Sequence, residues 1–178
     1  SDLPACLKAR TTYARGIGEV LDDAPILPET GILLVTPGVT LMTASVFQAR
    51  RGVVNQPNRF DKSPKDAAAL AALLAERGND LTDAALSLCP VIRNVLTALE
   101  AAPGCLLARM TGSGATCFGI FDDLAAAEAA APAATTAAAA APTAEVRSWG
   151  AGASAKATSG AGASAKTTSE AWSWGAEA

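Results

Sequence analysis

A glycine-rich run at residues 111–116, TGSGAT, carries the strongest chemical signal in the sequence. Its glycines, Gly112 and Gly114, allow the backbone around Ser113 to come close to a bound group and to direct N–H donors at an anion, for which phosphate is the natural candidate. A tight turn that needs positive φ would use the same residues, so both interpretations stay open. Arg109, just upstream, is either a second anion contact or a surface cation.

Other residues could also do chemistry, and each has a plainer alternative. Asp2 stands in the run SDLP and, taken alone, is typical of a turn or a helix cap. Phe47 lies on a predicted short helix, where an aromatic ring could stack on a base or could pack in the core. Asn79 and Asp80 follow a glycine that ends a helix, which predicts a cap for the next helix.

Histidine is absent from the sequence, and this removes Ser-His-Asp and Cys-His nucleophile chemistry. Any catalysis must therefore use carboxylates, lysines, hydroxyls and backbone groups. The four cysteines, Cys6, Cys89, Cys105 and Cys117, stand far apart without a CxxC pair. We therefore expect no metal site and interpret them as small buried hydrophobic residues.

Charge and hydrophobicity narrow the classes of partner. The 178 residues carry 14 basic and 17 acidic side chains, a net charge of −3, and the basic residues are scattered. This provides no electrostatic footprint for a nucleic-acid backbone, so we expect no nucleic-acid partner. No uninterrupted apolar run of membrane-spanning length precedes the C-terminal third, and the N-terminus lacks a secretory-signal pattern. We therefore expect no membrane partner and a cytoplasmic location.

The elements that must position these residues begin with residues 31–38, GILLVTPG, which predict a buried strand followed by a turn. Thr43 is then the expected N-cap of a short helix. Residues 52–64 are polar and rich in Asn, Pro and Arg, which predicts a surface loop. At its end, Ser63-Pro64 predicts the start of a helix that continues to about Ala75.

Further helices and strands follow in the second half. Residues 81–88 and 91–101 predict two helices separated by Pro90, so three successive helices must pack together or onto a sheet. Residues 105–121 contain two apolar runs around TGSGAT, which predict a glycine-rich strand-loop-strand. Residues 123–141 predict an alanine-rich helix, interrupted near Pro132.

The ends of the chain differ in character from its middle. Residues 150–159 and 160–169 are nearly identical repeats of small residues, which cannot build a core. The chain begins without Met in a strand-like pattern, so we expect it to be a fragment. We divide it into a folded domain at residues 1–125, an alanine-rich helix with a possible closing strand at 126–149, and a low-complexity tail at 150–178.

Taken in order, the motifs resemble the 4-diphosphocytidyl-2-C-methyl-D-erythritol kinase family of the GHMP kinase superfamily. The resemblance covers about residues 1–125, and its most specific parts are RGIGEVL and ARMTGSGATCF. The motifs that carry it are SDLP at 1–4, RGIGEVL at 15–21, LLVTPGV at 33–39, TASVF at 43–47, NDLT at 79–82 and ARMTGSGATCFGIF at 108–121.

This resemblance implies a ferredoxin-like GHMP C-terminal lobe of α/β (α+β) class, with a small, mainly antiparallel sheet and helices on one face. It also implies phosphorylation of the 2-hydroxyl of 4-diphosphocytidyl-2-C-methyl-D-erythritol by ATP, with Mg²⁺ expected although no ligand for it is identifiable. Asp2 would be the catalytic base, and Thr43 and Phe47 would contact the substrate, Phe47 by stacking on its cytosine. The residues that would form the phosphate-side loop are Gly112, Ser113 and Gly114.

The sequence departs from the family at both ends. The family's N-terminal lysine, its base-stacking Tyr and its long glycine-rich ATP loop precede the catalytic Asp and are not found in these 178 residues. The missing N-terminal half of the kinase is therefore an expected partner, and the isolated chain is expected to be inactive. The alternative is a non-catalytic remnant or interaction module with the same fold. At the other end, Trp149 is a candidate for the family's closing strand.

Overall fold

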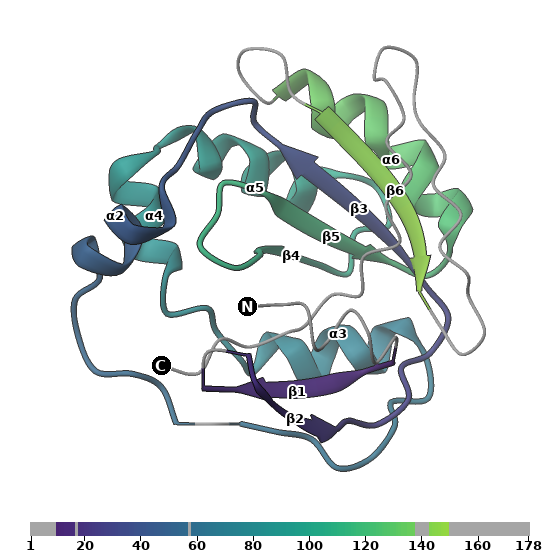
Figure 1. Ribbon diagram of the computed structural model, residues 1–178. Coiled ribbons are helices and arrows are strands. Elements are labelled where there is room, and N and C mark those ends of the chain that lie inside the picture. Colours follow the sequence, from purple (N-terminus) through teal and green to yellow (C-terminus); the bar gives the residue numbers. More distant parts are fainter. Residues whose placement is uncertain (1–9, 17, 57, 138–142, 150–178) are drawn as a thin grey trace.

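The computed structural model describes residues 10–16, 18–56, 58–137 and 143–149 (Figure 1). Two sheets are present among them, and the strand pairings in both are antiparallel. The first sheet contains β1 (Thr12–Arg15) and β2 (Val20–Asp23), and the second contains, in spatial order, β4 (Leu107–Met110), β5 (Cys117–Phe121), β3 (Thr30–Thr36) and β6 (Thr143–Trp149). The predicted class, α/β with a small, mainly antiparallel sheet, is confirmed.

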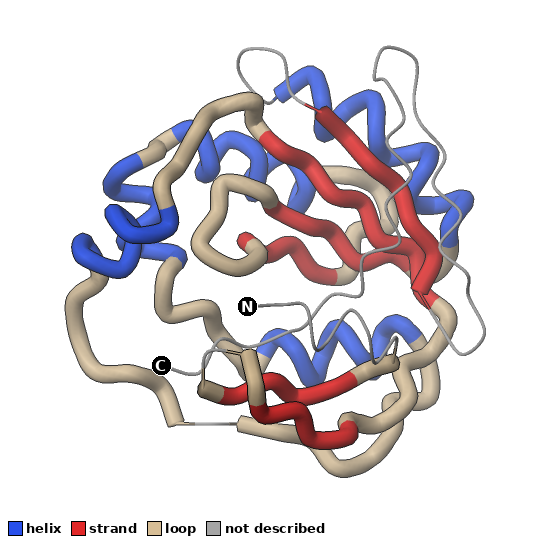
Figure 2. Tube along the Cα trace, viewed as in Figure 1, coloured by secondary structure: helices blue, strands red, loops and turns tan. Residues whose placement is uncertain are grey.

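The helices in the described part of the chain are α2 (Thr43–Ala49), α3 (Ala67–Ala75), α4 (Thr82–Leu88), α5 (Val91–Ala101) and α6 (Leu124–Ala137). Helices α5 and α6 lie behind the four-stranded sheet and cover one of its faces, as Figures 1 and 2 show. Ile92, Val95 and Leu99 of α5 are buried in one cluster with Leu33 and Phe121 of the sheet. This cluster is the main core, and it fixes the strands that carry the candidate site.

The hairpin β1–β2 packs against the other side of the sheet together with α3. Ile32 and Ile120 are paired across β3 and β5, and strand alternation places Ile32 on the face opposite to its neighbour Leu33. The two isoleucines line a small apolar cavity with Tyr13 of β1 and Leu70 of α3. This hairpin was not predicted from the sequence.

Three predicted helix features need correction. The N-cap of α2 is Met42 and not Thr43, which is instead the first helical residue. Helix α3 begins later than Ser63-Pro64 implies, because Asp66 is its N-cap and accepts a hydrogen bond of 2.7 Å from the Ala69 N–H. Helix α6 continues through Pro132 rather than being interrupted there.

The three cysteines in the described residues are free, as expected, but only Cys117 is fully buried. Burial raises the pKa of the Cys117 thiol to about 12, and burial likewise raises the pKa of the half-buried Cys105. Both remain neutral thiols at neutral pH and act as small hydrophobic side chains. Cys89 is also half-buried, and Cys6 lies outside the described residues. No helix in the described part of the chain has the length and apolar character needed to cross a bilayer.

Candidate functional site

The glycine-rich run forms the connection between β4 and β5. Two backbone hydrogen bonds of 3.0 Å close it, one from the Thr111 N–H to the Thr116 carbonyl and one from the Gly114 N–H to the Thr111 carbonyl. Gly112 and Gly114 have positive φ values of 55° and 84°, which glycine adopts at the least cost. The run is therefore a tight turn, as one interpretation of the sequence required, and its backbone conformation leaves the phosphate interpretation open.

Side chains from two other elements contact the tip and one end of this glycine loop, residues 111–116. The Thr36 hydroxyl, at the end of β3, lies 2.8 Å from the Thr116 hydroxyl. The Thr43 hydroxyl, at the start of α2, lies 2.9 Å from the Ser113 hydroxyl. The structure thus brings Thr43, predicted on the substrate side, into contact with Ser113, predicted on the phosphate side.

Helix α2 presents one side to the core and the other to solvent. Val46 is completely buried and packs in the main core, whereas the adjacent Phe47 is 47% exposed. The alternative that Phe47 is a core residue is therefore wrong. A half-exposed aromatic ring one turn beyond Thr43 is available to pack on a planar ligand.

Asn79 and Asp80 do not form the helix cap that the sequence predicts, since the N-cap of α4 is Leu81 and no side chain caps the helix. The Asn79 Oδ1 instead accepts a 3.0 Å hydrogen bond from the Leu81 N–H in the turn before α4. Its Nδ2 also donates to the carbonyls of Met110 and Gly112. The sequence does not predict this second role, since no local pattern shows that residue 79 lies beside residues 110–112.

The Asp80 carboxylate binds the segment that follows α2. It accepts hydrogen bonds from both the backbone N–H and the side-chain amide of Asn55. The Arg50 Nη2 atom lies 3.9 Å from Asp80 Oδ2, which places a cation at the end of α2 beside this carboxylate. The NDLT segment therefore connects the glycine loop to the region around α2.

The described contacts do not place two of the other predicted residues, Arg109 and Asp2, at this site. The Arg109 guanidinium donates to the Ala75 carbonyl at the end of α3, at 3.1 Å. Asp2, the predicted base, lies outside the described residues. Among the residues that the structure describes, no group of His, Cys, Asp or Glu could hold a metal ion.

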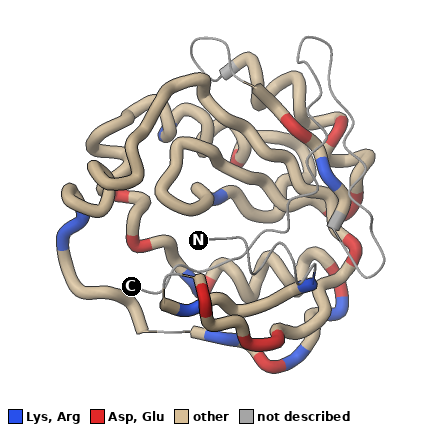
Figure 3. Tube along the Cα trace, viewed as in Figure 1, with Lys and Arg blue, Asp and Glu red and all other residues tan. Residues whose placement is uncertain are grey.

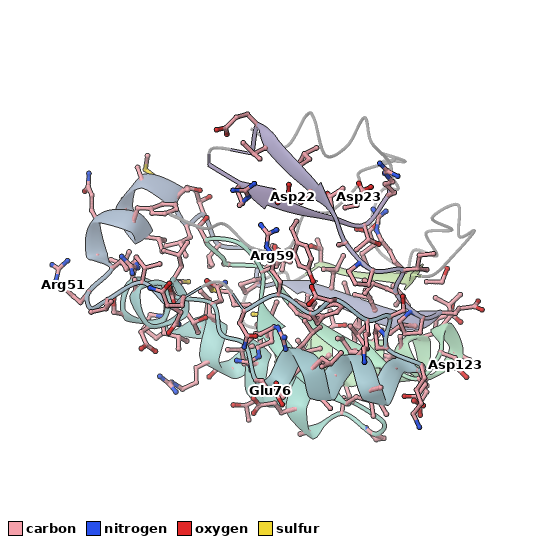
Figure 4. All side chains as sticks on the ribbon, turned by 90° about the horizontal axis from the view of Figure 1, so that it is seen from below. Asp22, Asp23, Arg51, Arg59, Glu76 and Asp123 are labelled. Atoms are coloured by element: carbon pink, nitrogen blue, oxygen red, sulfur yellow. The ribbon has the colours of Figure 1, made fainter. Side chains whose placement is uncertain are left out.

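Charges lie mainly away from the glycine loop, which has none of its own. Figure 3 shows both signs along β1 and β2. Asp22 receives hydrogen bonds from Arg59, at 2.7 Å, and from Arg15, at 3.1 Å, and these bonds lower the pKa of its carboxyl. Arg59 points toward Asp22 in Figure 4 and also covers the Tyr13 ring, at 4.8 Å from its centroid. Together these contacts fasten the hairpin to the loop before α3.

Residues 59–140 match the family model described as "GHMP kinases C terminal". The chain is 48% identical to the 4-diphosphocytidyl-2-C-methyl-D-erythritol kinase of Rhodospirillum rubrum over 128 aligned residues. The aligned segment covers 72% of this chain and 42% of that protein. It is 47% identical to the kinase of the same name from Paramagnetospirillum magneticum over 131 aligned residues, and this segment covers 74% of this chain and 46% of that protein.

Solved structures agree with these relatives. The crystal structure of a 4-(cytidine 5'-diphospho)-2C-methyl-D-erythritol kinase matches with a TM-score of 0.65 and 28% identity, over 85% of this chain and 54% of that one. The homoserine kinase of Cytophaga hutchinsonii shares the fold at 16% identity, with a TM-score of 0.53 over 73% of this chain and 44% of that one. The chain spans less than half the length of the two curated relatives named above.

Proposed function

The chain belongs to the GHMP kinases through its C-terminal domain, and from this premise we propose that it forms the substrate-side half of a 4-diphosphocytidyl-2-C-methyl-D-erythritol kinase. The observation that supports the proposal best is the hydrogen bond between Thr43 and Ser113. It joins the position that would contact the substrate to the loop that would face the phosphates, so both reactants could meet at one place.

The residues around the glycine loop fit a phosphate group. A β-carbon added at Gly112 would meet no atom within 4 Å, so the space beside this residue is open to a ligand. ATP, when bound, supplies the γ-phosphoryl group to the substrate. The donor set for Mg²⁺ does not fit in the same way, because the described residues contain no group of three or more His, Cys, Asp or Glu side chains that could hold a metal ion. We therefore assign none of the described residues to the metal.

Each remaining residue has a role in the proposed reaction. Asp2 orients the 2-hydroxyl of the substrate and accepts its proton, since phosphoryl transfer needs a carboxylate at the nucleophile. Phe47 stacks on the cytosine ring, and Thr43 contacts a polar group of the substrate. Backbone N–H groups of the glycine loop stabilise the negative charge on the transferring phosphate.

A chimeric enzyme tests the proposal. In it, this chain replaces the matching C-terminal part of the Rhodospirillum rubrum kinase, which it resembles at 48% identity. We expect ATP-dependent phosphorylation of 4-diphosphocytidyl-2-C-methyl-D-erythritol by the chimera and none by the 178-residue chain alone. A chimera that folds but transfers no phosphate would leave the chain as a non-catalytic module and refute the proposal.

The role of Asp2 is tested in the same chimera. Asp2→Asn should lower kcat by about 100-fold or more while the substrate Kd changes only a few-fold, because a base acts mainly in the transition state. Asp61→Asn, which makes the same change at an exposed loop residue, is the matched control. Near-normal kcat in the Asp2 variant would return Asp2 to the role of a turn residue.

A further inference from the structure

We infer that Asn79 is a positioning residue, which sets the direction of the Ser113 N–H in the glycine loop. The importance of that N–H for catalysis rests on the proposed function, whereas the positioning itself can be tested without it. Asn79 is half-buried in the connection between α3 and α4, and the loop that it contacts lies more than thirty residues further along the chain.

The two ends of the Asn79 amide have separate tasks. Its oxygen accepts from the Leu81 N–H at 3.0 Å and so closes the turn that leads into α4. Its nitrogen donates to the Met110 carbonyl at 3.2 Å and to the Gly112 carbonyl at 2.8 Å. One side chain therefore uses its acceptor for this turn and both of its donors for the loop.

The bond to the Gly112 carbonyl determines where the next N–H points. The peptide between Gly112 and Ser113 is trans, and in a trans peptide the C=O and the N–H point in opposite directions. Because the Gly112 oxygen faces Asn79, the Ser113 N–H faces away from Asn79. Rotation of this peptide is otherwise easy, since Gly112 has φ of 55° and open space around its Cα.

The Ser113 side chain is fixed from another element. Its hydroxyl lies 2.9 Å from that of Thr43 on α2, so the residue is held by α2 through its side chain and by Asn79 through its peptide. Two such restraints keep a backbone donor in one orientation before an anion arrives. Preorganised donors of this kind stabilise developing charge without reorganisation at the moment of reaction.

The variant Asn79→Asp separates the two tasks. A carboxylate still accepts from the Leu81 N–H in the turn before α4, but it has no N–H to give and repels the carbonyl oxygens of Met110 and Gly112. Asn94→Asp makes the same change at an exposed position on α5 and serves as the matched control. If Asn79 served only the turn before α4, Asn79→Asp would leave the glycine loop unchanged. If Asn79 positions the loop, the same change should loosen it.

Hydrogen exchange in the 178-residue chain gives a readout that needs no catalysis. We expect the amides of Thr111 and Gly114, whose bonds close the loop, to exchange about tenfold faster or more in Asn79→Asp, which corresponds to about 1.4 kcal/mol. The Ala85 amide, bonded to the Leu81 carbonyl within α4, should keep its wild-type rate. Unchanged loop exchange, or equal acceleration in α4, would overturn the inference.

If Asn79→Asp does not fold, Asn79→Ser provides the same comparison without an added charge. A serine hydroxyl can still accept from the Leu81 N–H but is too short to reach the loop carbonyls. We expect the same pattern of faster exchange in the loop and normal exchange in α4. Protection of the loop at wild-type level in this variant would contradict the positioning role.

Kinetics of the chimera then test the catalytic consequence. Asn79→Asp should lower kcat by about tenfold or more, while the KM for the diphosphocytidyl substrate stays within about twofold, because the Ser113 N–H is then no longer held toward the transferring phosphate. Asn94→Asp should leave both constants unchanged. An inactive parent chimera would refute the proposed function but leave the exchange result standing, so the two failures are distinguishable. Normal kcat with faster loop exchange would show that the orientation of the Ser113 N–H does not matter for turnover and would overturn the catalytic part.

Discussion

The hydroxyl oxygens of Thr43 and Ser113 lie 2.9 Å apart, although the two residues are separated by 70 positions in the sequence. One belongs to the first turn of α2 and the other to the tip of the glycine loop between β4 and β5. Because α2 also carries the half-exposed Phe47, this contact joins the helix of the proposed base-stacking residue to the proposed phosphate loop.

A double-mutant cycle should detect this hydrogen bond. Thr43→Val and Ser113→Ala each remove one hydroxyl, and we expect a coupling free energy of about 0.5–1 kcal/mol between them in urea unfolding of the 178-residue chain. The control pair is Thr43→Val with Thr116→Val, because the Thr116 hydroxyl bonds to Thr36 and not to Thr43. The losses of unfolding free energy in this pair should be additive. Additivity in the Thr43–Ser113 cycle as well would show that the contact does not hold α2 to the loop.

Phe47→Ala should weaken substrate binding far more than it weakens the fold. Stacking of a base on an aromatic ring contributes about 1–3 kcal/mol, so the substrate KM of the chimera should rise by about 5-fold to 150-fold. The ring is 47% exposed, so the free energy of unfolding should fall by less than about 1 kcal/mol. Met42→Ala, at a 66% exposed neighbour, is the control and should leave KM unchanged. An unchanged KM in Phe47→Ala would remove Phe47 from the substrate site.

The two loop glycines should respond differently to alanine. A β-carbon at Gly114 would lie 2.8 Å from the Met110 sulfur, whereas one at Gly112 would meet nothing within 4 Å. Positive φ alone costs about 1–2 kcal/mol, and crowding adds about 1–3 kcal/mol. Urea unfolding should therefore show a loss of about 1–2 kcal/mol for Gly112→Ala and a clearly larger loss for Gly114→Ala. Equal losses would mean that the contact with Met110 relaxes freely.

Asp22 should make stability depend on pH in the acid range. Hydrogen bonds from Arg59 and Arg15 lower its pKa below the ordinary value of 3.8. The ionised Asp22 carboxylate, bonded to the two arginines, therefore stabilises the fold above pH 3.8, and this contribution disappears as the pH falls through the lowered pKa. Wild type should be more stable than Asp22→Asn at about pH 5, and the difference should shrink at about pH 2.5. Salt at about 1 M should reduce the stability difference between wild type and Asp22→Asn at about pH 5, since Asp22 and its arginine partners are accessible to solvent. A difference that does not change with pH would exclude the carboxylate as its source.

The elements that the sequence predicts well have their signals within the element or beside it. Helix α5 has the predicted bounds because Pro90 precedes it and Pro103-Gly104 follows it. Strands β4 and β5 are short apolar runs on either side of a glycine turn. The hairpin β1–β2 has neither feature: TYAR and VLDD are mixed sequences, and their stability comes from distant partners such as Phe60, whose carbonyl and N–H both bond the Tyr13 hydroxyl.

The same distinction applies to the site. The glycine loop is visible in the sequence because glycine is required for its positive φ values. The cap prediction for Thr43 was wrong, since its hydroxyl bonds Ser113 instead of a backbone N–H of its own helix. The donors of Asn79 could not be assigned either, because their acceptors lie 31 and 33 residues away and are backbone oxygens that any residue type provides.

The last strand should be essential, whereas the repeats that follow it should not. β6 pairs with the whole length of β3, from Thr143 opposite Thr36 to Trp149 opposite Thr30, and it places Val146, 5% exposed, in the main core. A chain ended at residue 142 would leave β3 as an open edge and uncover this core, so we expect a large loss of stability or no folding.

A chain ended at Gly150 keeps every pair of β6 with β3. The segment that it lacks, residues 151–178, consists mainly of alanine, glycine, serine and threonine, whose side chains bury too little apolar area to offset the cost of ordering the backbone, about 1–2 kcal/mol per residue. The urea midpoint of this truncation should therefore equal that of the full chain, while the midpoint of the chain ended at residue 142 falls sharply. A large fall on removing residues 151–178 alone would show that the repeats contribute to the folded domain, because no pair between β6 and β3 is lost in that truncation.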